Sequence, residues 1–149
     1  MNPFVTAALL MCTTGDPVIA DRIAQEAVLK DTDVVVAVAI GIMESGLQPG
    51  NPMGAIGCYP EAKKKYHRTT NDCINIGVQS IHNRLWDAKV TKPSKSDIRH
   101  CSKSGNMTMC RALIAYNGAD KGRKYVYAKR AMGLIRKIYQ LVGNRMPNV

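Results

Sequence analysis

Residues 31–45 read DTDVVVAVAIGIMES and decide the fold, because an acidic cap here precedes the longest apolar run of the chain. The β-branched residues between Val34 and Met43 favour a buried strand, whereas the length of the run and the cap at Asp33 favour a buried helix. We predict a helix. The run is far shorter than the roughly 20 residues that cross a bilayer, so we expect no transmembrane segment.

Helical spacing continues on both sides of this stretch. Asp16-Pro17 predicts a helix over about 17–30, and Asp72 caps an apolar stripe that reaches Leu85. Further helices are expected over 61–66, from Asn106 or Thr108 to Tyr116, and over about 123–142, the last with Val126, Met132, Ile135, Ile138 and Val142 inward. The Gly- and Pro-rich residues 45–60 and the basic residues 89–105 are expected as loops. No alternating strand pattern appears, so we predict one all-α domain over residues 1–149; an α+β domain with a minor hairpin is the alternative.

Composition and charge limit the classes of function. The chain has 149 residues, of which 46% are hydrophobic and 21% charged, which excludes a disordered or fibrous protein. The net charge of +10 is uneven, because residues 1–62 carry −5 and residues 63–149 carry +15. The basic part is suited to an anionic partner: nucleic acid, anionic lipid or the bacterial cell wall.

Cysteine and histidine spacing argues against a metal site. The five cysteines form no C-x-x-C pair and the three histidines no H-E-x-x-H pattern, so we expect no metal site. Cys101 and Cys110 flank a polar loop that a disulfide could close, and Cys73 is expected as a buried free thiol. Surface positions are expected for His67, His82 and His100, and a core position for Trp86.

The N-terminal apolar run differs from an export signal. Phe4 to Met11 lacks a basic segment before it and a small-residue cleavage site after it, so we expect no signal peptide and a start in the cytoplasm.

Glu44 is the strongest candidate for chemistry. It ends the apolar run and precedes a glycine-rich loop. A carboxyl group that loses solvation at such an edge has a raised pKa, which suits a general acid. The alternative is a glutamate in the last turn of a helix that faces water.

Four motifs then follow one another in order: Glu44-Ser45-Gly46, Gly54-Ala55-Ile56-Gly57, Asn75-Ile76-Gly77 and Ala115-Tyr116-Asn117-Gly118. Their order and spacing resemble the lytic transglycosylase family with the soluble-lytic-transglycosylase, lysozyme-like domain, over most of the chain. The resemblance implies a helical domain with a catalytic groove, acting as a monomer on peptidoglycan glycan strands without a cofactor.

The resemblance also assigns roles to residues. It implies Glu44 as the catalytic acid/base and substrate contacts at Ser45, Gly54, Ile56, Tyr116 and Asn117. A tyrosine of the last helix also lines the family's groove; Tyr127 fits the pattern better than Tyr125, and both registers stay open. The glutamine that the family places after the glycine-rich loop is absent, because Gly57 is followed by Cys58. A cysteine at this place, Cys73 just before Asn75, resembles the branch of the family that is found in secretion and conjugation systems.

One carboxylate is enough if the substrate supplies the nucleophile. Most glycosidases need two carboxylates, and Glu44 has no companion in its own segment. In the family, the 6-hydroxyl of N-acetylmuramic acid attacks, which gives a 1,6-anhydro product.

Two other functions remain open. A goose-type lysozyme-like muramidase would use Asp72 or Asp120 to position a water molecule. A nucleic-acid-binding module would use Lys63, Lys64, Lys65 and Arg68, although few aromatic residues are present for base stacking. We expect the wall-cleaving enzyme and no stable nucleic-acid partner, in a bacteriophage lysis or virion protein or, alternatively, a periplasmic secretion-system component.

Overall fold

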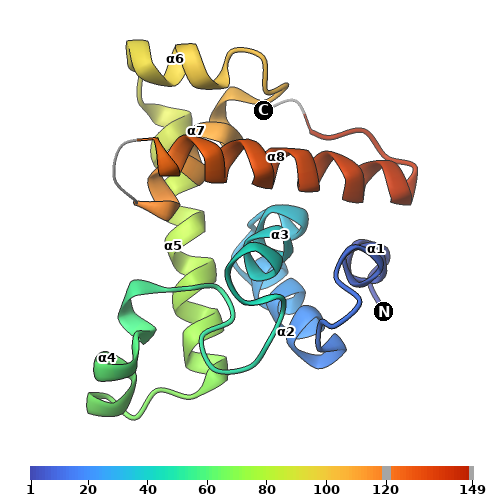
Figure 1. Cartoon of the computed structure of the whole chain (residues 1–149), viewed down its shortest axis with the longest axis vertical. Coiled ribbons are helices and arrows are strands. Elements are labelled where there is room, and N and C mark those ends of the chain that lie inside the picture. Colours follow the sequence, from blue (N-terminus) through green and yellow to red (C-terminus); the bar gives the residue numbers. More distant parts are fainter. Residues whose placement is uncertain (119–121, 148–149) are drawn as a thin grey trace. The chain divides into compact units, whose positions relative to one another are not determined.

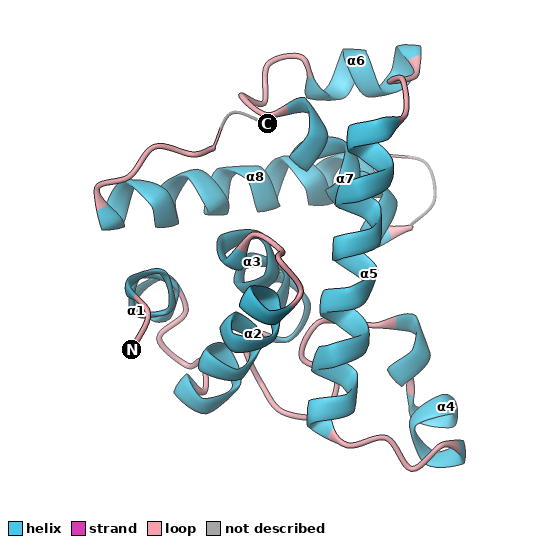
Figure 2. Ribbon diagram, turned by 180° about the vertical axis from the view of Figure 1, so that it is seen from behind, coloured by secondary structure: helices cyan, strands magenta, loops and turns pink. Residues whose placement is uncertain are grey.

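The computed structural model describes residues 1–118 and 122–147, and every regular element in these ranges is a helix (Figure 1; Figure 2). The elements are α1 (Pro3–Met11), α2 (Pro17–Leu29), α3 (Val34–Ser45), the 3₁₀ helix η1 (Ile56–Cys58), α4 (Pro60–Lys65), α5 (Thr70–Val90), α6 (Lys95–Cys101), α7 (Met107–Asn117) and α8 (Arg123–Val142). The all-α class is confirmed, and no hairpin occurs in the part of the chain that the structure describes. Within the same ranges, no helix is both long and apolar enough to cross a membrane.

The chain forms two compact units, Met1–Ser80 and Ile81–Val149. The first contains α1 to α4 and the beginning of α5; the second contains the end of α5 and α6 to α8. The single domain over residues 1–149 stays a prediction beside this division.

Helix α3 forms the core of the first unit. Asp33 begins it by accepting a hydrogen bond from the Val36 amide at 3.0 Å, and Gly46 ends it in the left-handed conformation with φ of 66°. All residues from Val35 to Gly41 are buried. Burial on all sides therefore outweighs the strand preference of the β-branched run, and the predicted helix is confirmed.

Helices α1 and α2 pack against α3 and against each other. The side chain of Asp16 caps α2 as predicted, accepting from the Val18 amide at 2.9 Å. Helix α1 contains the apolar run from Phe4 to Met11, for which the sequence predicted no signal peptide and no helix was proposed. Asn2 caps it, and its residues Val5, Ala7 and Ala8 are buried.

The second unit is built around the pairing of α7 with α8. Asn106 caps α7 by accepting from the Met109 amide at 3.0 Å, and α8 spans the predicted residues 123–142. Two predicted core positions are wrong, since Val126 is 53% exposed and Trp86 is 60% exposed. Trp86 lies just beyond the apolar stripe of α5, and the helix turn carries it toward solvent.

Helix α6 corrects the prediction of a loop over residues 89–105. Ser94 and Asp97 form a reciprocal capping box, in which each side chain accepts a hydrogen bond from the other's backbone amide. Asp97 also pairs with Arg111 at 3.1 Å. Capping and ion pairing, rather than an apolar face, stabilise this helix, so a polar sequence can form it.

Two disulfides cross-link the chain. The Cys101–Cys110 bond, which the sequence left as a possibility, is present. The prediction of a free thiol at Cys73 is wrong, because Cys73 is bonded to Cys58. This second bond ties η1 to the start of α5 inside the first unit. The start of α5 is also corrected, since Thr69 rather than Asp72 precedes it.

Candidate active site

Glu44 occupies the last turn of α3, where Asp33 and Gly46 fix the ends of the helix. Its side chain is exposed, as the alternative interpretation of a helix-end glutamate expected. The raised pKa that the sequence pattern indicates for Glu44 stays a prediction.

The glycine-rich loop closes on this carboxyl group. A Cβ atom built on Gly54 would lie 2.7 Å from Cδ and 3.0 Å from Cγ of Glu44. Gly54 also has φ of +62°, a conformation that residues with a side chain rarely adopt. The backbone conformation requires glycine here, and a side chain at this position would displace the Glu44 carboxyl group. The structure thus brings these two predicted site residues together.

Ser45 organises the start of the loop. Its hydroxyl group donates to the carbonyl of Pro52 at 2.8 Å and accepts from the amide of Gln48 at 3.0 Å. These bonds fold the chain back after α3, so Ser45 helps to place Gly54 beside Glu44. Its predicted contact with substrate stays a prediction.

Asn51 is a positioning residue that the sequence analysis missed. Its side-chain amide donates to the Ala55 carbonyl at 3.0 Å, and its side-chain oxygen accepts from the Ala55 amide at 2.9 Å. This pair of bonds closes the turn that contains Gly54. An asparagine in a Pro- and Gly-rich stretch is the sequence signal that could have identified it.

The Cys58–Cys73 bond anchors the other end of the loop. Ala55 and the two cysteines form a buried cluster against which Ile76 packs. The guanidinium group of Arg68 donates a hydrogen bond to the carbonyl of Gly57. Ile56 is left 73% exposed on η1, where a ligand can reach it.

The remaining predicted residues belong to the second unit. Tyr116 and Asn117 form the last turn of α7 and are half-buried. On α8, Tyr125 stacks on His100 with ring centroids 3.7 Å apart, and its hydroxyl group lies 2.7 Å from that of Ser96.

The two tyrosines lie in different surroundings. Tyr125 is committed to α6, whereas Tyr127 lies about 200° further around the helix and is half-buried. Which of the two tyrosines contacts a ligand stays a prediction.

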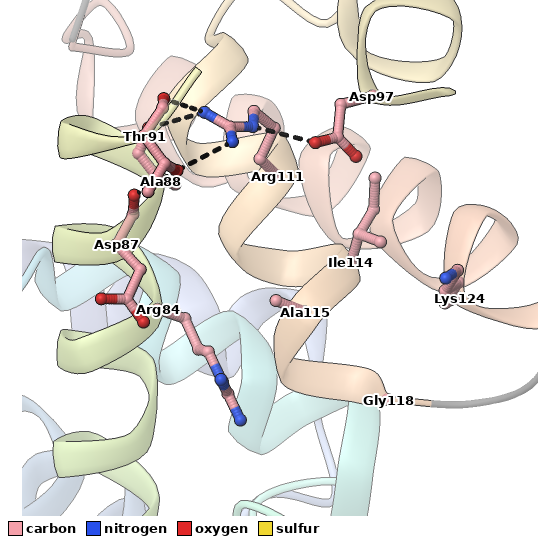
Figure 3. Close-up of a pocket in the computed structure, with 10 residues that line it drawn as sticks. All are labelled: Arg84, Asp87, Ala88, Thr91, Asp97, Arg111, Ile114, Ala115, Gly118 and Lys124. Carbon is pink, nitrogen blue, oxygen red and sulfur yellow. Dashed lines mark hydrogen bonds and ion pairs between the residues drawn. The ribbon is translucent and has the colours of Figure 1, made fainter. Parts of the chain in front are cut away.

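A cavity of about 400 Å³ lies beside the end of α7 in the second unit (Figure 3). Ile114, Ala115 and Gly118 line it, together with charged side chains from α5, α6 and α8. Arg111 is saturated: it donates to the Ala88, Thr91 and Lys92 carbonyls and pairs with Asp97. This arginine closes the end of α5 and has a structural role.

No family model, no curated protein and no solved structure matches this chain. Function is therefore inferred from the residues around Glu44 and from the order of the motifs.

Four other carboxylates of the first unit have structural tasks. Asp16 and Asp33 cap helices, and the buried Glu26 pairs with Arg22 at 3.3 Å. Asp72 accepts from the amide of Thr69 at 2.8 Å, and this bond is the main cause that lowers the pKa of Asp72. Among residues 1–118 and 122–147, no three His, Cys, Asp or Glu side chains gather as metal ligands.

Proposed function

We propose that the chain is a peptidoglycan lytic transglycosylase with Glu44 as its acid/base. The observation that carries the proposal is the contact between the Gly54 backbone and the Glu44 carboxyl group. The Gly54 backbone borders one side of an exposed carboxyl group and adds no side chain there. A sugar ring can then approach the carboxyl without meeting a side chain at position 54.

The chemistry needs no second carboxylate. Glu44 protonates the glycosidic oxygen as the bond between C1 of N-acetylmuramic acid and O4 of the next sugar breaks. The sugar's own O6 then bonds to C1, and Glu44 accepts the proton that O6 releases. No water is consumed, and the product is a 1,6-anhydro sugar.

The hydrogen bonding of Asp72 favours this reaction over hydrolysis. A glycosidase that activates water or forms a glycosyl-enzyme places a second carboxylate on the far side of the bond. Asp72, one candidate for that role, instead accepts a hydrogen bond from the Thr69 amide in the first turn of α5. Asp120, the other candidate, lies outside the described residues.

The two disulfides bear on where the enzyme acts. Disulfides form and persist in oxidising compartments and are rare in the cytoplasm. Both disulfides therefore favour action outside the cytoplasm. A lysis enzyme that reaches the wall and a periplasmic secretion-system enzyme both satisfy this condition.

Replacement of Glu44 tests the proposal. Glu44→Gln keeps the shape of the side chain but removes the transferable proton, so release of muropeptides from purified peptidoglycan should fall by at least about 10²-fold. Glu61→Gln, which changes an exposed carboxylate on α4, is the matched control and should keep wild-type activity. A Glu44→Gln variant as active as the wild type would overturn the assignment.

Mass spectrometry of the products separates the two enzymes. Anhydro ends on the released muropeptides support the transglycosylase. Reducing ends would instead identify a muramidase.

A further inference from the structure

The loop that carries Gly54 also lines a second concave surface of the first unit. This cavity, about 560 Å³ in volume, is lined by Asn51, Cys58, Tyr59, Pro60, Lys63 and Lys64, and we name it the lysine pocket. Its size lies within the range of about 300–1,000 Å³ that is usual for sites of small ligands. Because Asn51 also closes the Gly54 turn, the pocket and the contact with Glu44 share one loop.

The pocket has an excess of positive charge. In the described part of the chain, neither Lys63 nor Lys64 takes part in an ion pair. The Lys63 ammonium group lies over the loop, 3.8 Å from where a Cβ atom on Gly50 would be.

The neighbouring cations have other partners. Lys65 lies 5.3 Å and Arg68 4.7 Å from the centre of the Tyr66 ring, and Arg68 also donates to the Gly57 carbonyl. Lys63 and Lys64 are therefore the two cations that the pocket presents to a ligand.

The rest of the lining is largely apolar. Tyr59 is 54% exposed, Pro60 beside it is also exposed, and the buried Cys58 is held by its disulfide. A fitting ligand therefore combines anionic groups with apolar surface and is slender enough to enter a cavity. A carboxylate-bearing peptide has these properties, whereas a nucleic-acid duplex presents phosphates on a wide, convex surface.

We propose that the lysine pocket binds the stem peptide of peptidoglycan, with Lys63 and Lys64 on its free carboxylates. This inference rests on the proposed function. The stem peptide is attached to the lactyl group of N-acetylmuramic acid, which is the sugar whose C1–O4 bond the reaction breaks. A peptide site on the loop that carries Gly54 would thus recognise the substituent next to the bond that is cleaved.

Binding of a monomeric muropeptide tests the proposal without any cleavage. The probe is one disaccharide that bears a stem peptide with free carboxylates, and it contains no bond between disaccharides for the enzyme to cut. Each exposed ion pair is worth a factor of up to about five, so Lys63→Ala with Lys64→Ala should weaken calorimetric binding by roughly tenfold. Lys63→Arg with Lys64→Arg should keep the affinity, and so should Lys30→Ala, an exposed lysine at the end of α2.

A second probe isolates the carboxylates. The same muropeptide with amidated carboxylates should bind the wild type about as weakly as the free-acid form binds the double-alanine variant. The peptide site would be refuted if the wild type bound both probes with equal affinity. It would also be refuted if the double-alanine variant bound the free-acid probe as tightly as the wild type does. Salt-sensitive binding of duplex DNA that the double-alanine change abolishes, with muropeptide binding intact, would assign the lysines to nucleic acid instead.

The readouts separate this inference from the proposed function. Lysine-dependent binding of the muropeptide by a chain that releases no anhydro products would retain the peptide site and reject the transglycosylase. Equal cleavage of intact and peptide-free glycan strands by the wild type and the double-alanine variant would retain the enzyme and reject the peptide site.

Discussion

Gly54→Ala is the substitution that tests most directly how the loop serves Glu44. The new methyl group would lie 2.7 Å from the Glu44 carboxyl carbon and would force a residue with a side chain to keep φ of +62°. The left-handed backbone costs about 1–2 kcal/mol. The contact itself costs little stability, because Glu44 is a flexible, exposed side chain that can turn away.

The displacement of the Glu44 carboxyl group by the new methyl group should lower the catalytic rate. A shift of about 1 Å in a catalytic group can cost about 10²-fold in rate, so we expect a loss of that size in muropeptide release. Gly143→Ala is the matched control: Gly143 has φ of +80°, and no atom lies within 4 Å of its added Cβ. In urea unfolding both variants should lose a similar free energy, and only Gly54→Ala should lose activity. Equal activity of the two variants would refute the view that Gly54 makes room for the catalytic carboxyl group.

Three further outcomes follow from the structure. Because hydrogen bonds from Thr69 lower the pKa of Asp72, the ionised carboxylate contributes to folding stability above about pH 4, and this contribution is lost as the pH falls further. In urea unfolding, Asp72→Asn should therefore be less stable than the wild type at neutral pH and equally stable in acid. Replacing Cys58 and Cys73 by serine opens a loop with a sequence separation of 15 and should cost about 3 kcal/mol of unfolding free energy, together with activity. Arg111→Leu leaves several carbonyls and Asp97 without their donor and should lower the unfolding free energy by about 2–3 kcal/mol, measured by the same method.

Local signals in the sequence account for most of the helices. Asp16, Asp33 and Asn106 are capping residues whose side chains bond amides two or three positions ahead, so their effect is readable from neighbours in the chain. The apolar period of residues 123–142 likewise predicts α8. The sequence pattern did not predict helix α6, because its apolar periodicity is weak, although Ser94 and Asp97 of its capping box are readable in the sequence.

The candidate site divides in the same way. The sequence alone identified Glu44 as an isolated carboxylate before a glycine-rich loop and placed it at the end of a helix, because both signals are local. Only the tertiary structure decided that Gly54 meets its carboxyl group, that Asn51 closes the turn and that Cys58 pairs with Cys73. The physical reason is that these contacts depend on how the loop folds back on α3 and α5, and loop closure involves residues that no short-range period relates.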